Sequence, residues 1–290
     1  MARIAYVNGR YVPLSEAAVS IEDRGFQFAD GVYEYFSVFD GRLADAKGHF
    51  ERLWRSLSEL RIPAPMSEAA LRIVMAETVR RSRVRQGSVY LQINRGVAAR
   101  DHAFPNPAPH PSVVVVAKPV DFSIGEARAA VGAKVVTRPD NRWGRCDIKT
   151  VGLLPNVLAK QTAREAGAYE AWLVDDLGFV TEGASTNAWI VDEAGVLRTR
   201  DTNANILRGV TRHQLLDIAE REGIEVSQRP FTVEEAKRAR EAFITAASTF
   251  VMPVVAVDGA KIGDGAPGPV AKRLRALYLS TAHLNAVQGG

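Results

Sequence analysis

Apolar residues in this chain repeat at two different spacings, and the order of the two spacings restricts the folds open to it. In the first part of the 290-residue chain, apolar runs or alternations predict strands at residues 4–7, 10–12, 32–38, 89–93 and 113–116. Phe50, Leu53, Trp54 and Leu57 share one face at helical spacing, and Ser67 is a suitable N-cap for a second helix. The sequence therefore predicts a first lobe that mixes sheet and helix.

The rest of the chain mixes short strands with helices in a different order. We expect strands at residues 133–137, 170–174, 179–181, 187–191 and 196–199, and helices at residues 153–166, 211–222 and 269–286. Thr232 and Glu235 form a capping box for another short helix. The mixture indicates an α+β fold in two lobes rather than alternating parallel βαβ units. We place an N-terminal lobe at residues 1–120, a linker at residues 121–126 and a C-terminal lobe at residues 127–290.

Composition excludes several classes of protein. The hydrophobic share of 47% and the charged share of 24% are those of a soluble globular protein, and no apolar run approaches the roughly 20 residues that span a bilayer. The net charge of +4 is mild, so we expect no nucleic-acid partner. The single cysteine, Cys146, excludes an internal disulfide, and with no secretion signal at the start we expect a cytoplasmic protein. The histidines lack metal-ligand spacing, so no metal is expected.

Lys149 is the residue with the most informative neighbours. It ends the segment Arg142-Trp143-Gly144-Arg145-Cys146-Asp147-Ile148-Lys149, in the predicted C-terminal lobe. An amine attacks an aldehyde only when it is neutral, so an imine-forming lysine needs a lowered pKa, which apolar neighbours and the positive charge of Arg145 would favour. A solvated lysine at the end of a strand is the alternative.

Two later motifs supply the other parts of a pyridoxal phosphate site. Glu182 stands before Gly183 in a turn rich in small residues, where a carboxylate could face a pyridine nitrogen. Gly209 and Thr211 open a helix whose N–H groups could bind a phosphate. A solvated turn acid and a plain threonine cap are the alternatives for Glu182 and Thr211.

Three groups elsewhere could bind anionic atoms. Arg52, on the polar side of the first helix, could bind the phosphate with two hydrogen bonds from its charged guanidinium. Arg100 could hold a carboxylate bidentately with His102 beside it, and Tyr33 could supply a third hydrogen bond. A loop arginine that is simply solvated is the alternative for Arg100.

These motifs together resemble the fold-type IV pyridoxal-phosphate enzymes, which include branched-chain aminotransferases, aminodeoxychorismate lyases and D-amino-acid aminotransferases. The resemblance extends from Glu22 to Pro253 and is closest to the D-amino-acid aminotransferases, above all in Arg145-Cys146-Asp147-Ile148-Lys149 and in the pair Arg100 and His102. It implies a two-lobed enzyme with pyridoxal 5'-phosphate as cofactor, and an amino acid and a 2-oxo acid as substrates. It also implies a homodimer, in which Arg100 and His102 reach the site of the neighbouring subunit.

The resemblance also implies a role for each matching residue. Lys149 would form the imine and shuttle the proton, and Glu182 would pair with the ring nitrogen. A further set would hold the cofactor, and a third set would hold the substrate carboxylate. The cofactor set is Arg52, Ser185, Val210, Thr211 and Ala247, and the carboxylate set is Tyr33, Arg100 and His102. Arg142 matches a position near the cofactor, with no role that the sequence explains.

The chain departs from the family pattern at two places. Ala246 and Ala247 stand where relatives often have a hydroxyl or a Gly-Thr pair against the phosphate, and Phe250 stands where relatives often have glutamate. We expect a transaminase that moves an amino group from a D-amino acid, D-alanine above all, to 2-oxoglutarate in ping-pong fashion. A branched-chain L-amino-acid aminotransferase, an aminodeoxychorismate lyase and a binding module on a decayed scaffold are the alternatives.

Overall fold

The computed structural model describes residues 3–202 and 205–288, and these form two compact units. The first unit runs to Phe122 and also takes in Ile148–Gly152 and the chain from Ala282 onward. The second unit comprises Ser123–Asp147 and Leu153–Thr281. The two units correspond only in part to the predicted lobes, because the short segment that carries Lys149 belongs to the first.

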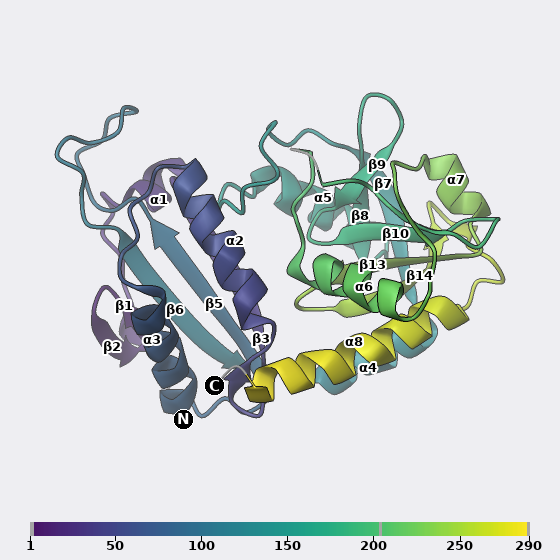
Figure 1. Cartoon of the computed structure of the whole chain (residues 1–290). Coiled ribbons are helices and arrows are strands. Elements are labelled where there is room, and N and C mark those ends of the chain that lie inside the picture. The colour runs from purple at the N-terminus through teal and green to yellow at the C-terminus, as the bar shows by residue number, and fades with distance from the viewer. Residues whose placement is uncertain (1–2, 203–204, 289–290) are drawn as a thin grey trace. The chain divides into compact units, whose positions relative to one another are not determined.

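The first unit is built on a six-stranded antiparallel sheet with the strand order β2-β1-β6-β5-β3-β4. Its strands are β1 (Ile4–Val7), β2 (Arg10–Pro13), β3 (Gly31–Phe39), β4 (Arg42–Leu43), β5 (Gly87–Asn94) and β6 (Ser112–Pro119). Helices α2 (Ala46–Glu59) and α3 (Glu68–Arg81) pack on one face of this sheet (Figure 1). A short 3-10 helix, η1 (Leu14–Glu16), and the short helix α1 (Arg24–Phe28) precede β3.

Side-chain alternation separates the two faces of this sheet. Val89, Leu91 and Ile93 of β5 are completely buried in an apolar core with Phe50 and other residues of α2 and α3. The residues between them, such as Tyr90, point to the other face and are only partly buried. The apolar face thus builds the core, which leaves the opposite face to polar side chains.

The segment Ile148–Gly152 adds to the edge of β3. Ile148 is buried in the apolar core of the first unit, and Thr150 forms an antiparallel bridge with Val32. The Tyr33 amide donates to the Lys149 carbonyl at 3.0 Å. This differs from the predicted placement of Lys149 in the C-terminal lobe, because strand pairing between residues far apart in the chain has no local sequence signal.

The second unit contains a nine-stranded mixed sheet. Eight strands follow the order β12-β11-β10-β13-β14-β7-β8-β9, with β15 paired to β14. They are β7 (Ala133–Pro139), β8 (Glu170–Val174), β9 (Val180–Gly183), β10 (Asn187–Val191), β11 (Leu197–Thr199), β12 (Val226–Gln228), β13 (Glu241–Ala246), β14 (Phe250–Val257) and β15 (Ala260–Lys261). Strand β7 is parallel to both β8 and β14, while most other pairs are antiparallel, as expected for the predicted α+β class.

The helices after β6 in the described residues are α4 (Phe122–Val131), α5 (Leu154–Glu165), α6 (Val210–Arg221), α7 (Val233–Arg238) and α8 (Pro269–Gln288), and the last part of α8, from Ala282, belongs to the first unit. The predicted capping box of α7 is confirmed, since Thr232 accepts from the Glu235 amide and Glu235 accepts from the Thr232 amide. Residues 122–126 of the predicted linker at residues 121–126 are instead the first part of α4. No helix in the described residues combines the length and the apolar composition needed to cross a membrane.

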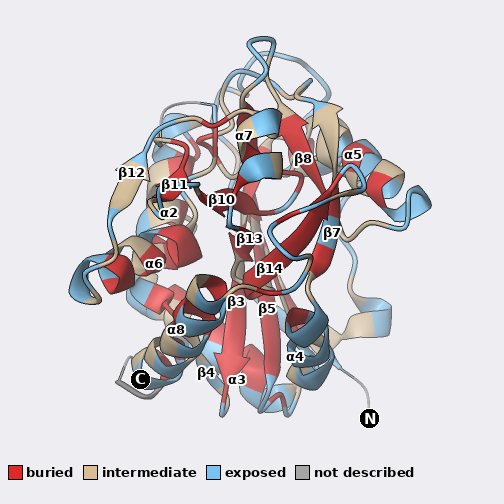
Figure 2. Ribbon diagram, turned by 90° about the vertical axis from the view of Figure 1, so that its right-hand side faces the viewer, coloured by how far each residue is buried: buried red, intermediate tan, exposed pale blue. Residues whose placement is uncertain are grey.

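The sequence patterns do not predict β13 and β14. Figure 2 shows both strands as mostly buried, and every residue of β14 is buried. A strand covered on both faces has no apolar–polar alternation, so its periodicity cannot separate it from other buried elements. The turn between these two strands carries Ala247, one of the predicted cofactor-binding residues.

Candidate active site

Lys149 and Tyr33 lie together in the first unit. The Lys149 Nζ atom lies 4.2 Å from the centroid of the Tyr33 ring, and the Lys149 amide donates to the Ser56 Oγ atom at 3.4 Å. Both the main chain and the side chain of Lys149 are therefore placed by β3 and α2. The structure thus brings together two of the residues that the sequence predicts to share a site.

Polar side chains surround Tyr33 on its face of the sheet. The Tyr33 ring packs against Tyr90 with centroids 5.6 Å apart, and the Tyr90 hydroxyl donates to Gln92 at 2.7 Å. Gln92 in turn donates to Asn94, which donates to Asp23. Burial, together with the neighbouring Tyr33, raises the pKa of Tyr90 to about 12. This hydroxyl therefore stays protonated at neutral pH and keeps its role as donor.

Arg52 is held by a buried acid that the sequence analysis does not single out. The Arg52 Nε and Nη2 atoms donate to the two oxygens of Glu34 at 2.7 Å each. The His49 Nδ1 atom lies 2.8 Å from the second of these oxygens. Burial alone would raise the pKa of Glu34, but Arg52 and His49 lower it to about 2. The sequence does contain one signal for this buried ion pair. Glu34 is a charged residue at a strand position whose neighbours on the same face are apolar.

Replacement of Glu34 by glutamine should destabilise the protein strongly and in a pH-dependent way. The change leaves Arg52 buried without its counter-ion, which costs roughly 3–5 kcal/mol at pH 7. A carboxylate whose pKa is depressed from 4.5 to about 2 adds stability above its unfolded pKa, and this stability is lost as the pH falls from about 4.5 towards 2. Urea denaturation at pH 7 and at pH 3.5 should show the gap between wild type and Glu34→Gln shrinking at the lower pH.

The control for this variant is Glu51→Gln on α2, the helix that carries Arg52. Glu51 is largely exposed and lies 3.9 Å from Lys47, which is even more exposed. Such a pair contributes little to stability. A Glu34→Gln protein as stable as the Glu51→Gln protein at pH 7 would show that the buried ion pair is not needed.

Arg100 and His102 lie in the long segment between β5 and β6, and both are exposed. Their side chains meet on one aromatic ring of α1. The Arg100 guanidinium lies 5.0 Å from the centroid of Phe28, and the His102 ring centroid lies 5.3 Å from it. The two predicted carboxylate ligands are thus brought together, on a common support in the first unit.

Glu182 lies in the second unit, at the end of β9, and is almost fully buried. One oxygen forms a short ion pair with Arg142, and the other accepts from the Asn187 side chain at 2.9 Å. The Leu207 amide lies within 3.2 Å of both oxygens. Burial raises the pKa of Glu182, while Arg142 and the Leu207 amide oppose that shift. The solvated turn acid considered from the sequence is therefore excluded.

Arg142 has a structural explanation that the sequence does not provide. It lies between two acids, because Asp140 accepts from its Nε and Nη2 atoms at 2.9 and 2.7 Å while Glu182 pairs with its Nη1 atom. Burial opposes a charge here, but the two carboxylates raise the pKa of Arg142 above its ordinary value. Arg142 is therefore a fixed cation beside Glu182.

Asn187 is a second residue around Glu182 whose role sequence reasoning misses. Its amide bridges Glu182 and the Leu207 carbonyl, the latter at 3.0 Å. A Cβ on Gly209 would lie 2.0 Å from the Asn187 Oδ1 atom, so glycine is needed there. Gly183, in contrast, is needed because a Cβ would lie 2.1 Å from the Thr186 hydroxyl. Gly183 therefore makes room for a neighbouring side chain.

The predicted anion site at Gly209 to Thr211 is the start of α6. Gly209 is the N-cap, Val210 is the first helical residue, and Thr211 is the second. Thr211 is therefore not the cap, which removes the alternative of a plain threonine cap. Its hydroxyl lies 3.4 Å from the Tyr278 hydroxyl, and the Tyr278 ring packs 5.9 Å from Phe250. The amide groups of this first turn lie at the positive end of the helix dipole, where anions bind.

The turn between β13 and β14 carries the residues where the chain departs from the family pattern. Ala246 is paired with Phe250, which has a positive φ of 59°. Within the described residues, the buried Thr249 hydroxyl has no hydrogen-bond partner. An unpaired buried hydroxyl is unfavourable, so a ligand or a water molecule that accepts from it or donates to it would be stabilised here.

Two further residues named from the sequence have other partners. The Ser185 hydroxyl donates to the buried Glu170 at 2.6 Å, and Lys160 lies 3.2 Å from the same carboxylate. Arg145, whose positive charge is expected from the sequence to act on Lys149, is instead paired with Asp147 at 2.9 Å. Arg145 thus stabilises its own turn.

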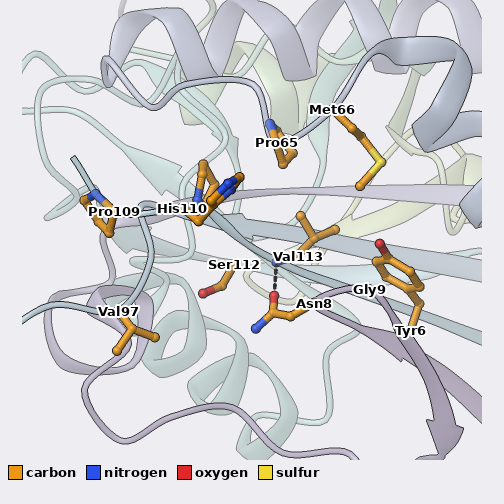
Figure 3. A pocket seen from close by; sticks show the side chains of 11 residues that line it. Tyr6, Asn8, Gly9, Pro65, Met66, Val97, Pro109, His110, Ser112 and Val113 are labelled. Carbon is orange, nitrogen blue, oxygen red and sulfur yellow. Dashed lines mark hydrogen bonds between the residues drawn. The ribbon is translucent and has the colours of Figure 1, made fainter. Parts of the chain in front are cut away.

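The first unit also contains an open pocket of about 480 Å³. Figure 3 shows Tyr6, Met66 and His110 around it, with a hydrogen bond from the Val113 amide to the Asn8 side chain at 2.7 Å. None of the predicted site residues lines this pocket. It therefore contributes nothing to the assignment of the site.

The donors and acceptors present fit pyridoxal phosphate. Glu182 is a buried carboxylate fixed beside a cation, which suits a protonated pyridine nitrogen. The start of α6 and the Thr249 hydroxyl, which has no partner among the described residues, suit a phosphate. Lys149 has an amine of the kind that could attach such a cofactor covalently.

Comparison with known proteins agrees with this chemistry. The Amino-transferase class IV family matches residues 31–257. A D-alanine aminotransferase of Staphylococcus haemolyticus is 40% identical over 271 residues, which covers 93% of this chain and 94% of that protein. A D-alanine aminotransferase of Bacillus licheniformis is 41% identical over 268 residues, which covers 92% of this chain and 93% of that protein.

Solved structures give the same family. A branched-chain amino acid aminotransferase of T.th., determined with pyridoxamine 5'-phosphate, has a TM-score of 0.90 at 30% identity, and the match covers 98% of this chain and 95% of that chain. A branched-chain amino acid aminotransferase of Escherichia coli has a TM-score of 0.90 at 24% identity, covers 99% of this chain and 96% of that chain, and supports the fold alone. The chain therefore belongs to the class IV aminotransferases, and it is a pyridoxal-phosphate-dependent transaminase of fold type IV.

Proposed function

We propose that this transaminase moves the amino group of a D-amino acid, D-alanine above all, to 2-oxoglutarate. The observation that carries the proposal is the match to D-alanine aminotransferases at about 40% identity over more than nine-tenths of the chain. The pair Arg100 and His102 supports it, since both side chains contact Phe28 and an arginine beside a histidine is a suitable carboxylate ligand.

Lys149 is the residue that we assign to covalent attachment and proton transfer. When bound, pyridoxal phosphate supplies an electron-withdrawing ring that makes the Cα–H bond of an amino acid acidic. The Lys149 Nζ atom would take the proton from Cα as a general base and then, as a general acid, donate it to the cofactor carbon that carries the transferred amino group. Its place over the Tyr33 ring and its main-chain bond to β3 keep the amine in one position.

Glu182 and the start of α6 are assigned to the two ends of the cofactor. Glu182 would accept the proton of the ring nitrogen in a hydrogen bond, with Arg142 and Asn187 fixing its orientation. Val210 and Thr211 would bind the phosphate through their main chain and hydroxyl. Arg52, Ser185 and the Ala247 main chain complete the proposed set, although Arg52 and Ser185 also hold buried acids.

The substrate carboxylate is assigned to Tyr33, Arg100 and His102, with the last two reaching the site of a second subunit. A homodimer with shared sites is therefore part of the proposal. Helix α5 supports it, because Leu154, Val157 and Leu158 are 69%, 57% and 58% exposed, and a second copy of the chain would cover such a face. We also propose a cytoplasmic location, which suits a protein whose one cysteine is a free thiol.

The experiment that tests the proposed function is a panel of D- and L-amino acids with 2-oxoglutarate. We expect D-alanine to be the best donor and to exceed L-leucine in kcat/KM by about 100-fold or more, because the carboxylate ligands decide which Cα–H bond faces Lys149. Parallel lines in double-reciprocal plots would confirm ping-pong exchange. A better rate with L-leucine would overturn the assignment of Arg100 and His102.

A branched-chain L-aminotransferase is the second candidate, and the structural match to the T.th. enzyme favours it. The same panel decides between the two. An aminodeoxychorismate lyase would show no exchange between amino acids and 2-oxo acids. A binding module without activity would show no turnover with any donor, and it would stay colourless with added pyridoxal phosphate if the lysine chemistry had been lost.

A further inference from the structure

The segment that carries Arg100 and His102 has no regular secondary structure between β5 and β6, yet one buried arginine holds it. Arg24, the first residue of α1, is only 3% exposed. Its Nη1 atom donates to the Asp101 carbonyl at 2.5 Å, and its Nη2 atom donates to the His102 carbonyl at 3.3 Å. One guanidinium thus binds the main chain at both residues that follow Arg100.

The remaining N–H group of this guanidinium, at Nε, is bound by a carboxylate. The Arg24 Nε atom donates to Asp30 at 2.8 Å. Asp30 is shared with Arg95, which donates to its two oxygens at 2.7 and 2.9 Å. Burial by itself would raise the pKa of Asp30, but the hydrogen bonds and charges of Arg95 and Arg24 lower it. The acid therefore stays ionised at neutral pH and holds Arg24 in one rotamer.

Phe28 completes the support from the same helix. Arg24 lies over the Phe28 ring, 4.7 Å from its centroid, and the same ring contacts the side chains of Arg100 and His102. Helix α1 is itself anchored, because its N-cap Asp23 accepts from Asn94 at 2.7 Å, and a Cβ on Gly25 would lie within 2.4 Å of the Asn94 side chain. A chain of close contacts therefore runs from β5 through α1 to the two exposed side chains.

We propose that Arg24, with Phe28 as its aromatic support, is a positioning residue for substrate-carboxylate binding by Arg100 and His102. This rests on the proposed function, in which those two side chains bind the carboxylate. Arg24 donates to carbonyls rather than to substrate, so it acts by holding the main chain of the segment. A guanidinium is needed because three acceptors in one plane must be bound at once, which an ammonium cannot do in the same geometry.

The test is the Arg24→Lys variant of the holoenzyme. This substitution keeps the positive charge and removes the planar guanidinium that binds several acceptors at once. We expect KM for both the amino acid and the 2-oxo acid to rise about tenfold, while kcat changes less than about twofold, because only carboxylate binding is weakened. Hydrogen exchange of the amides at residues 99–104 should become faster. An unchanged KM, or a fall in kcat at constant KM, would overturn the positioning role.

A second pair of variants guards against a folding defect. Phe28→Leu removes the aromatic support and should raise KM in the same direction as Arg24→Lys. Phe26→Leu on the same short helix is the matched control, since Phe26 is 71% exposed, and it should leave KM unchanged. If Phe26→Leu raised KM as much as Phe28→Leu, the effect would come from the helix in general, and the proposal would fail.

The double variant Arg100→Ala, His102→Ala separates this inference from the proposed function. If Arg24 acts through these side chains, Arg24→Lys should add less than about twofold to KM in that background, a clear non-additivity. A further tenfold rise in KM on adding Arg24→Lys would overturn the inference, while the assignment of Arg100 and His102 as carboxylate ligands would stand. If the double variant itself leaves KM unchanged, the carboxylate assignment is wrong, and the positioning role falls with it.

Discussion

Replacement of Lys149 by alanine should abolish amino transfer, with a loss in kcat of at least about 10⁴-fold, because the variant lacks both the covalent attachment and the group that moves the Cα proton. The protein should still fold, since the side chain contributes one ring contact, to Tyr33, and its main-chain bond to Tyr33 remains. End-point activity assays with D-alanine and 2-oxoglutarate measure the loss in kcat. Visible absorbance should show that the covalently held chromophore is gone.

The matched control is Lys118→Ala, which removes an exposed lysine at the end of β6 in the same unit. This variant should keep wild-type kcat and absorbance. Borohydride reduction followed by peptide sequencing gives an independent readout, because the tag should be found on Lys149. A tag on another lysine, or measurable turnover by the Lys149→Ala protein, would refute the assignment on which the mechanism depends.

Replacement of Glu182 by glutamine should lower kcat by about 10²–10³-fold, because a neutral amide cannot hold the ring nitrogen in its protonated form. The change also places an amide NH₂ group among donors, since Arg142, Asn187 and the Leu207 amide all point at the present carboxylate. We therefore expect a stability loss of about 1–3 kcal/mol as well. Steady-state kinetics and urea denaturation measure the two effects separately.

Glu193→Gln is the control for this second prediction. Glu193 lies in the turn between β10 and β11, and its side chain is 71% exposed at 3.7 Å from Arg238. We expect neither kcat nor stability to change. The cofactor role of Glu182 would be excluded if Glu182→Gln lost stability but kept its kcat, since the network would then serve only the fold.

Much of the fold could be predicted from local patterns. The hairpin of β1 and β2, the apolar face of α2, the Ser67 cap of α3 and the capping box of α7 all lie where short-range chemistry predicts them. Each of these signals comes from residues within one or two turns of each other, so no tertiary contact is needed to recognise it. Strands β13 and β14 are the counter-example, because burial on both faces removes the alternation.

The site residues could be named from the sequence, but most of their partners could not. Glu182 is visible in a turn motif, whereas the cation beside it, Arg142, lies forty residues earlier in the chain. Arg52 is visible on a helix face, whereas Glu34 and His49 are recognised only when α2 packs on β3. The assignment of Lys149 to a lobe fails for the same reason, since the segment is paired by main-chain bonds to Gly31 and Tyr33.

The order of residues alone was enough to show which chemical groups this protein has: one lysine in an informative segment, an acid in a turn, a glycine-led helix start and an arginine–histidine pair in a loop. How those groups are oriented and charged became visible only in the folded chain. Arg24 illustrates the difference, because it becomes a support for Arg100 and His102 only when its guanidinium reaches two carbonyls far along the chain. The physical reason is that hydrogen bonds and burial depend on distance in space, whereas sequence patterns record only distance along the chain.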